Sequence, residues 1–317
     1  MVDQHHHHHH HPQPPSQPHN FEPMAIKSTS WLITGASSGL GQAIALAALQ
    51  AGHRVVGATR DVAAAERTNP GFAARGGVWV RLDPARADAH DRFAEVARAH
   101  GVDVLVNNAG YAHVGGVEDT SEEEVRAQME VNFYGPLRAV RACLPVMREK
   151  GFGHVVIISS AAGFIARAGR GVYSASKFAI EAIHESLSHE VAPLGVKVLI
   201  VEPGAFRTRF ATRLVTPAAH DGSGGVSEPY RGTVLDAMVS MSRGITEVPP
   251  PHLLRGDPDK AGREIVRAVD DGYDYLRMVL GPDCVVAMDQ KLASLQHDFE
   301  ATKAIALSTD FDVTEKA

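Results

Sequence analysis

A glycine-rich turn between an apolar run and an Ala- and Leu-rich segment constrains the fold of this chain more than any other feature. Trp31–Ile33 has the composition of a buried strand, and residues 42–52 predict a helix that ends at Gly52. Thr34–Gly41, between them, reads Thr-Gly-Ala-Ser-Ser-Gly-Leu-Gly. Glycines let a backbone approach a pyrophosphate, and a helix N-terminus offers unpaired N–H groups and the positive end of its dipole. The position between strand and helix therefore favours a dinucleotide site, which a glycine-rich turn alone would not.

Short apolar runs alternate with helical segments along the rest of the chain. Most of these runs are nearly continuous in apolar residues, as in strands that are buried on both faces of a parallel sheet. The alternation predicts an α/β fold with a Rossmann-like, doubly wound parallel sheet of about seven strands flanked by helices. The predicted strands cover residues 29–34, 54–58, 78–82, 103–106, 154–159, 196–201 and 276–280.

Tyr173 and Lys177 stand four residues apart in a segment that predicts a helix, so their side chains share one face, one turn apart. A phenol has a pKa of about 10 and is a poor acid or base at neutral pH. A fixed ammonium one turn away stabilises the phenolate, so we expect Lys177 to lower the pKa of Tyr173 toward neutrality. Because such pairs also occur by chance on helices that do no chemistry, other motifs must support this interpretation.

Further motifs occur at the ends of predicted strands or on the helices beside them. With the glycine-rich turn and the Tyr-x-x-x-Lys pair, their order and spacing resemble those of the classical short-chain dehydrogenase/reductase family. The resemblance covers roughly residues 28–283. The additional motifs are Asn107-Asn108-Ala109-Gly110, Asn132 in a helical stretch, Ser160 after a buried strand, and Pro203-Gly204 with Thr208 beyond it.

This resemblance implies hydride transfer between a nicotinamide cofactor and a carbonyl or secondary alcohol. Tyr173 is then the general acid, or the general base in oxidation, while Lys177 lowers its pKa and binds the nicotinamide ribose. Ser160 is the second donor to the developing oxyanion, because its spacing to Tyr173 matches the family. Ser159 is expected to bond locally instead. Asn132 is expected to hold a water that links Lys177 to solvent, and it could also satisfy a buried carbonyl in a kinked helix.

The resemblance also implies a set of cofactor contacts. The glycine-rich turn would line the pyrophosphate, the Asn-Asn-Ala-Gly motif would run beside the adenine-side ribose, and the residues after Pro-Gly would close over the nicotinamide. The implied contacts are Gly35, Ser37, Ser38, Gly39, Leu40, Gly41, Asn107, Ala109, Gly110, Val131, Pro203, Gly204, Phe206 and Thr208, besides Tyr173 and Lys177.

The end of the second predicted strand bears on the choice between NADP(H) and NAD(H). In NAD-preferring family members an acidic residue ends this strand and binds the ribose 2′-OH, whereas this chain has Thr59 followed by Arg60. A guanidinium binds a 2′-phosphate that a carboxylate would repel, so NADP(H) is favoured. Asp61 would bind the ribose 2′-OH of NAD only if the register of the second strand shifts, and we expect it to cap the next helix. Asp83 matches the position that contacts the adenine amino group, although it could equally cap a helix.

The segment from residue 205 to about residue 257 is expected to form a substrate lid, because it is long and contains glycine hinges. Helical pieces are expected around residues 207–215 and 229–243. Phe206 and Phe210 are candidate walls of the substrate site. The Gly256-Asp257-Pro258 start of a predicted helix and the later Leu280-Gly281 resemble one broad branch of the family. That branch includes uncharacterised oxidoreductases and relatives that act on steroids or retinoids, which implies a hydrophobic alcohol or ketone. His113 is a candidate substrate contact, although a lone histidine is more often structural or solvated.

Composition sets limits on the domain organisation. Residues 1–25 hold a polyhistidine run and a Pro- and Gln-containing linker, which we exclude from fold reasoning. Residues 26–317 are predicted to form a single NAD(P)-binding domain. The histidine run is a purification tag, and no metal site is expected. The net charge of −6 and the pI of about 6.3 give no basic surface for nucleic acid. No apolar run is long enough to span a membrane, and no secretory leader is recognisable, so a cytoplasmic location is predicted.

Family members usually form homodimers or homotetramers through the helices that carry Asn132 and Tyr173, and we expect the same here. The tail from Val285 to Phe311 is expected to join such an interface or to fold back on the core. Two other functions are compatible with the fold, namely a non-catalytic module that senses NADP(H) and an epimerase or lyase on the same fold. Loss of the Tyr or the Ser would have supported the sensor, and both residues are present.

Overall fold

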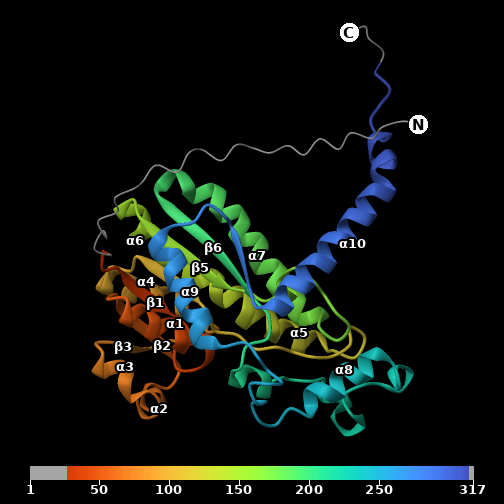
Figure 1. Ribbon diagram of the computed structural model, residues 1–317, viewed down its shortest axis with the longest axis horizontal. Coiled ribbons are helices and arrows are strands. Elements are labelled where there is room, and N and C mark those ends of the chain that lie inside the picture. The colour runs from red at the N-terminus through yellow and green to blue at the C-terminus, as the bar shows by residue number, and fades with distance from the viewer. Residues whose placement is uncertain (1–26, 314–317) are drawn as a thin grey trace, which may run out of the picture.

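The computed structural model describes residues 27–313, so the predicted tag and linker at residues 1–25 lie outside the described residues. All strand pairs in its seven-stranded sheet are parallel, in the order β3-β2-β1-β4-β5-β6-β7 (Figure 1). The order reverses between β1 and β4, and open α/β sheets bind ligands at such a reversal, outside the carboxyl ends of the strands. The strands are β1 (Ser30–Ile33), β2 (Arg54–Thr59), β3 (Val78–Arg81), β4 (Val104–Asn107), β5 (Gly153–Ile158), β6 (Val196–Pro203) and β7 (Arg277–Leu280).

Helices cover both faces of the sheet, which confirms the doubly wound arrangement. α1 and α9 pack on one face, while α4, α6 and α7 pack on the other. The helices are α1 (Gly39–Gln50), α2 (Val62–Thr68), α3 (Pro70–Ala74), α4 (Ala89–His100), α5 (Glu122–Met129), α6 (Gly135–Lys150), α7 (Gly171–Val191), α8 (Val234–Arg243), α9 (Pro258–Asp271) and α10 (Pro282–Leu307).

The apolar strands are explained by burial on both faces. Leu32 of β1 belongs to the core beneath α4 and α6, whereas its neighbours Trp31 and Ile33 belong to the core beneath α1 and α9. Successive side chains of a strand point to opposite faces, so a strand covered twice must be apolar throughout. Where α9 packs against α1, a Cβ on Gly262 of α9 would come within 2.7 Å of the Ala43 backbone in α1. The two helices therefore need a glycine where they meet.

The segment from residue 205 to residue 257 lies below the sheet in Figure 1, beyond the strand ends. It has its own apolar cluster, in which Val226 and two residues of α8 pack against Val114. Backbone bonds join it to the chain after β4, with Val114 N donating to Val215 O at 2.7 Å and Val215 N donating to Ala112 O at 3.0 Å. The helix expected around residues 207–215 is only a short 3-10 turn at Arg209–Thr212, and α8 begins at Val234 rather than at residue 229.

The C-terminal helix α10 leaves the body of the molecule (Figure 1). Only Cys284 and Ala287, in its first two turns, are buried. Leu292, Leu295 and Phe299 expose more than half of their surface. The expectation that the tail folds back on the core is therefore wrong for the described residues, because the helix makes its contacts only near its start. Among these residues, no helix is long and apolar enough to cross a bilayer.

Candidate active site

The glycine-rich turn between β1 and α1 has the geometry of an anion site. Gly35 and Gly39 have φ values of 58° and 60°, which glycine adopts without strain. A Cβ on Gly41 would lie 2.2 Å from the Gly35 carbonyl oxygen, so the turn can close only over a glycine. Ser38 is the N-cap of α1, but its side chain makes no capping hydrogen bond. The amides of the first turn of α1 therefore stay available for a phosphate group.

Thr34 and Asn108 hold this turn against the end of β4. The Thr34 hydroxyl accepts hydrogen bonds from the backbone amides of Asn108 at 2.9 Å and Ala109 at 3.2 Å. The side-chain amide of Asn108 donates to the Gly35 carbonyl at 3.3 Å. Asn108 was not among the predicted site residues, although the Asn-Asn-Ala-Gly motif contains it. The Asn107 side chain, in contrast, is buried and donates to the Pro136 carbonyl at 3.3 Å, so it anchors α6.

The loop after β6 reaches back to the glycine-rich turn. A Cβ built on Gly39 would lie 3.6 Å from the Thr208 Cβ, which places Thr208 beside the start of α1. Asp283 of α10 fixes the preceding loop, because its carboxylate accepts from the Ala205 amide at 2.8 Å. A Cβ on Gly204 would come within 2.3 Å of the same carboxylate, so the position requires glycine. The predicted residues of the Pro-Gly segment and of the glycine-rich turn therefore line one region.

Tyr173 and Lys177 lie on α7, and each is only 6% exposed. The Lys177 Nζ donates to the Ile158 carbonyl at the end of β5 (3.1 Å) and lies 5.8 Å from the centre of the Tyr173 ring. Burial lowers the pKa of Lys177 to about 8, and Glu181 opposes this effect.

The predicted fall in the pKa of Tyr173 is not found. Burial raises the pKa of Tyr173, and the opposing contributions come from a hydrogen bond with Ser160 and from the charge of Arg170. The expectation was wrong for this state of the protein because desolvation outweighs the favourable neighbours, and because Lys177 directs its ammonium to a backbone carbonyl.

The adjacent serines after β5 face different partners. The half-buried Ser160 accepts from the Ala162 amide at 3.1 Å, and its hydroxyl hydrogen remains free to bond Tyr173. The buried Ser159 donates to the Glu181 carboxylate at 2.7 Å, across 22 residues of sequence. The expectation that Ser159 bonds locally is therefore wrong, since its side chain points to α7. The preference for Ser160 as the residue beside Tyr173 agrees with this geometry.

Asn132 lies in a π-helical turn, Glu130–Tyr134, between α5 and α6. Wide turns of this kind often occur at functional sites because they redirect a side chain. The Asn132 amide donates to the Tyr111 carbonyl at 3.0 Å and to the Ser176 hydroxyl at 3.1 Å. A Cβ on Gly110 would lie 2.9 Å from the Asn132 Oδ1 and 3.9 Å from the Lys177 Nζ. Asn132 and Lys177 therefore flank Gly110, and Val131 is half-buried in the same turn.

The end of β2 has the predicted register. β2 ends at Thr59, and Arg60 follows it as an exposed residue. Asp61 accepts from the Ala64 amide at 3.0 Å and caps α2, as expected. Asp83 accepts from the Ala85 amide at 3.0 Å but caps no helix, because α4 begins six residues later and a turn intervenes.

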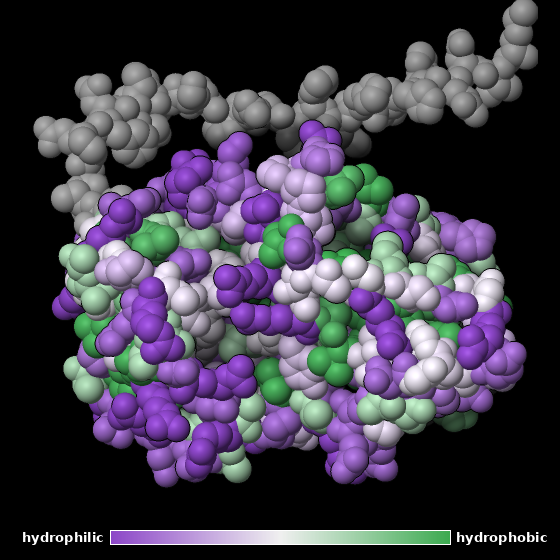
Figure 2. Space-filling view, turned by 90° about the horizontal axis from the view of Figure 1, so that it is seen from below, coloured by the Kyte–Doolittle hydropathy of each residue, from purple (hydrophilic) through white to green (hydrophobic). Residues whose placement is uncertain are grey.

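An aromatic side chain from the segment at residues 205–257 lies near Tyr173. The ring centres of Phe210 and Tyr173 are 6.1 Å apart, and Phe210 is 40% exposed. Figure 2 views the molecule from below and shows a hollow near the middle of this face, bordered by apolar and hydrophilic residues. His113 takes no part in it, because it is 2% exposed and bonded to Thr120 at 3.0 Å. Its role is structural.

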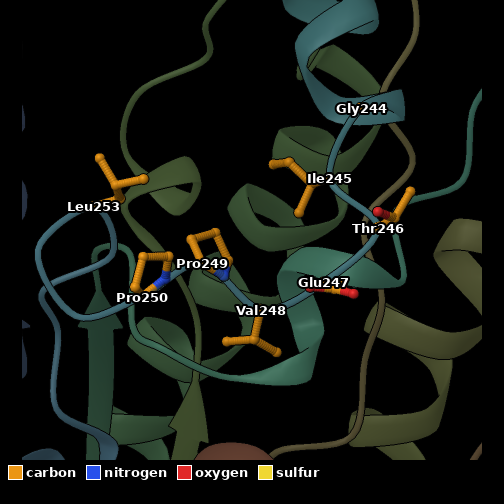
Figure 3. A pocket seen from close by; sticks show the side chains of 8 residues that line it. All are labelled: Gly244, Ile245, Thr246, Glu247, Val248, Pro249, Pro250 and Leu253. Atoms are coloured by element: carbon orange, nitrogen blue, oxygen red, sulfur yellow. The ribbon is translucent and has the colours of Figure 1, made fainter.

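A separate surface pocket of about 330 Å³ lies in the loop that follows α8 (Figure 3). None of the motif residues lines it, so its position does not mark the catalytic centre. The lining residues are Gly244, Ile245, Thr246, Glu247, Val248, Pro249, Pro250 and Leu253.

Comparison with known proteins agrees with the fold and the motifs. Residues 30–218 match the short chain dehydrogenase family. The protein belongs to this family. Oxidoreductase claN of Passalora fulva is 45% identical over 219 residues, which cover 69% of this chain and 97% of that protein. Oxidoreductase BOA17 of Botryotinia fuckeliana is 30% identical over 289 residues, covering 88% of this chain and 98% of that protein.

Solved structures place the chain in the same family. A short-chain dehydrogenase from Streptomyces avermitilis has a TM-score of 0.76 and 39% sequence identity, with 90% of this chain and 100% of that chain covered. The protein is thus a short-chain dehydrogenase/reductase with a Rossmann-like fold. Other similar structures hold NADP or NAD, so the comparisons leave the choice between these cofactors open.

Proposed function

We propose that this enzyme is an NADP(H)-dependent oxidoreductase that interconverts a carbonyl group and a secondary alcohol on a hydrophobic substrate. One observation carries the proposal. Ser160, just after β5, interacts with Tyr173 of α7, and Lys177, one turn further along α7, bonds the carbonyl at the carboxyl end of β5, on the same edge of the sheet as the uncapped start of α1. A proton donor and an anion site on one sheet edge suit a reaction in which a dinucleotide meets a carbonyl.

The chain has the features that a dinucleotide requires. The closed glycine-rich turn and the free amides of α1 would hold the pyrophosphate, with Thr208 beside them. Lys177, next to Gly110, would bind the ribose hydroxyls near the nicotinamide. NADP(H) would supply or accept the hydride at the substrate carbon.

The side chains of the site supply proton transfer and oxyanion stabilisation. In reduction the Tyr173 hydroxyl donates its proton to the substrate oxygen as negative charge develops there, and Ser160 donates a hydrogen bond to the same oxygen. The Lys177 ammonium stabilises the phenolate that Tyr173 becomes. Asn132, beside Gly110 and Lys177, is proposed to hold the water that returns a proton from solvent. In oxidation the same groups act in reverse, with Tyr173 as the base.

The preference for NADP(H) rests on the end of β2. Arg60 is exposed there, and within residues 27–313 it forms no ion pair, so its guanidinium can take a 2′-phosphate. Asp61, the alternative partner for a ribose hydroxyl, is already engaged as the cap of α2. Asp83 would contact the adenine from the end of β3.

The preference for a hydrophobic substrate rests on the segment from residue 205 to residue 257, which we propose as a lid. Phe210 faces Tyr173 from this segment, and Phe206 and Phe164 are half-buried near the same edge of the sheet. Burying an apolar substrate against such rings stabilises its complex.

A second copy of the chain is the proposed protein partner, in a homodimer or homotetramer. Tyr134, between α5 and α6, and Phe178 of α7 are 47% and 39% exposed. Exposed aromatic side chains on these helices suit an interface between subunits.

Cofactor oxidation by the purified protein tests the proposal. The substrates would be steroids, aryl ketones, quinones, aldehydes and small keto esters, each with NADPH and with NADH, and Tyr173→Phe would serve as control. Turnover with NADPH that disappears in the control is the expected result. Turnover that survives Tyr173→Phe would refute the role of Tyr173, and a clear preference for NADH would refute the role of Arg60. Tight NADPH binding without turnover on any compound would favour a sensing module.

A further inference from the structure

Two buried glutamates that the reaction does not use, Glu181 and Glu202, are close enough for each to change the pKa of the other. Glu181 lies on α7, one turn beyond Lys177, and is 3% exposed, while Glu202 lies in β6 and is fully buried. Glu181 accepts hydrogen bonds from the Ser159 hydroxyl at 2.7 Å and from the Arg277 guanidinium at 3.1 Å. Among the described residues, neither carboxylate oxygen of Glu202 has a hydrogen-bond donor.

These contacts determine which carboxyl group carries a proton. Two adjacent buried carboxylates cannot both be ionised, because each charge destabilises the other in a medium of low polarity. Glu181 has two donors that stabilise its anion, whereas Glu202 has none. Burial and the neighbouring Glu181 raise the pKa of Glu202, and a proton on Glu202 can be donated to Glu181. Protonation of Glu202 therefore satisfies a group that otherwise has no partner.

We propose that Glu181 and Glu202 share one proton and hold a single negative charge behind Lys177, and that this charge keeps the Lys177 ammonium protonated during turnover. Glu181 is then a positioning residue that acts through Lys177. The inference rests on the proposed role of Lys177 in assisting Tyr173.

The surroundings of Lys177 support this assignment. Burial lowers the pKa of Lys177, and Glu181 is the group that raises it. Residues four apart on a helix lie within about 6 Å of each other, close enough for a strong effect in a buried site. Polar groups from several elements surround the two glutamates and Lys177. They are Arg170 just before α7, Tyr173 and Glu185 of α7, Ser159 and Ser160 after β5, Asn132 of the π-helical turn, Arg277 of β7, and Asp283 and Cys284 of α10.

The absence of a side chain at Gly163 leaves room for the Glu181 carboxylate. A Cβ on Gly163 would lie 1.9 Å from a carboxylate oxygen of Glu181 and 2.4 Å from the Ser159 hydroxyl. The Glu181 carboxylate therefore occupies the volume that a side chain at this position would need. Gly163 belongs to the short turn that begins at Ser160, so Glu181 is packed directly against the catalytic segment.

Two isosteric substitutions test the proposal. Glu202→Gln keeps a donor to Glu181 and keeps the single charge, so the alkaline limb of the kcat/KM profile should stay at the wild-type pH. Glu181→Gln removes the carboxylate beside Lys177 and leaves Glu202, which burial alone keeps protonated, so Lys177 should lose its proton earlier and the alkaline limb should move to lower pH by about one unit. A purely structural role would lower activity without moving the limb. An unchanged limb in Glu181→Gln, or an equal shift in both variants, would overturn the proposal.

Two measurements need no turnover and so separate this inference from the proposed function. At neutral pH the wild-type infrared spectrum should contain the carbonyl band of a protonated carboxylic acid, which Glu202→Gln should remove. Absence of the band in the wild type would overturn the shared proton, even if a variant failed to fold. NMR of lysine-labelled protein should show a lower pKa for Lys177 in Glu181→Gln than in Glu202→Gln. Failure of the enzyme to reduce any carbonyl would leave both tests valid.

Discussion

The two adjacent serines after β5 should respond in opposite ways to alanine substitution. Ser159→Ala removes the hydroxyl that donates to the buried Glu181 at 2.7 Å. Loss of a hydrogen bond to a buried charged group costs about 1–3 kcal/mol of stability. For a protein of this size, such a loss lowers Tm by about 2–5 °C in total, at roughly 1.5–2 °C for each kcal/mol. Because the Ser159 hydroxyl bonds Glu181 and not Tyr173, activity below the unfolding transition should stay within about threefold of wild type.

Ser160→Ala should show the reverse pattern. The Ser160 hydroxyl accepts one hydrogen bond, from the Ala162 backbone amide within a short turn, and the residue is half-buried. The free energy of unfolding should therefore change by less than about 1 kcal/mol. The same hydroxyl bonds Tyr173 and would stabilise the developing oxyanion. Removal of one such donor reduces kcat by about 10²–10³-fold.

Thermal unfolding and steady-state kinetics of the two variants, measured on the same preparations, check this pair of predictions. Each variant serves as the control for the other, because the substitutions are chemically identical and one residue apart. If Ser159→Ala abolished activity while Ser160→Ala left it intact, the assignment of the two hydroxyls would be wrong.

Three further substitutions test other parts of the structure. Arg60→Ala should raise KM for NADPH by roughly 10–150-fold and leave KM for NADH unchanged, since a charge-assisted bond to phosphate contributes about 1.5–3 kcal/mol; equal effects on both cofactors would contradict its role. Gly41→Ala should weaken the binding of both cofactors in fluorescence titration, because its Cβ would lie 2.2 Å from the Gly35 carbonyl, whereas Gly71→Ala, where a Cβ would meet nothing within 4 Å, should leave binding unchanged. The exposed part of α10 carries apolar residues at the 3-4 spacing of a coiled-coil seam, namely Val285, Met288, Leu292, Leu295 and Phe299. Leu295→Lys with Phe299→Lys should therefore reduce the mass measured by light scattering, and Ser294→Lys with Ala301→Lys, off the seam, should not.

The sheet could be predicted from the sequence because burial on both faces leaves a local signal. All seven predicted strands are present, and the described ends differ from the predicted ones by at most two residues, as at Pro203 in β6. The register of β2 mattered most, because it places Arg60 rather than Asp61 directly after the strand. Asp61 could be assigned as a cap since capping depends only on the next three residues.

Some side-chain contacts could not be predicted because they join residues distant in sequence. The Ser159 hydroxyl meets Glu181 22 residues later, and Asn107 meets Pro136. Neither partner follows from strand or helix periodicity, because both depend on how α6 and α7 pack on the sheet. One signal was present in the sequence, since Glu202 directly follows four apolar residues, Val198–Val201, of a buried strand. A carboxylate in such a strand must be paired or protonated.

The pKa of Tyr173 shows why helix spacing alone could not predict the chemistry. Spacing places an ammonium one turn from a phenol, but burial raises the pKa of Tyr173 and lowers that of Lys177 to about 8. Both shifts favour the neutral forms, and a neutral phenol is the state that donates a proton to a carbonyl oxygen. We therefore expect reduction to proceed well at neutral pH and to decline as pH rises through about 8, where Lys177 loses its proton. Oxidation needs the phenolate, so its rate should increase from neutral toward mildly alkaline pH. Rates measured in both directions across this range would contradict the argument if oxidation were the faster direction at acidic pH.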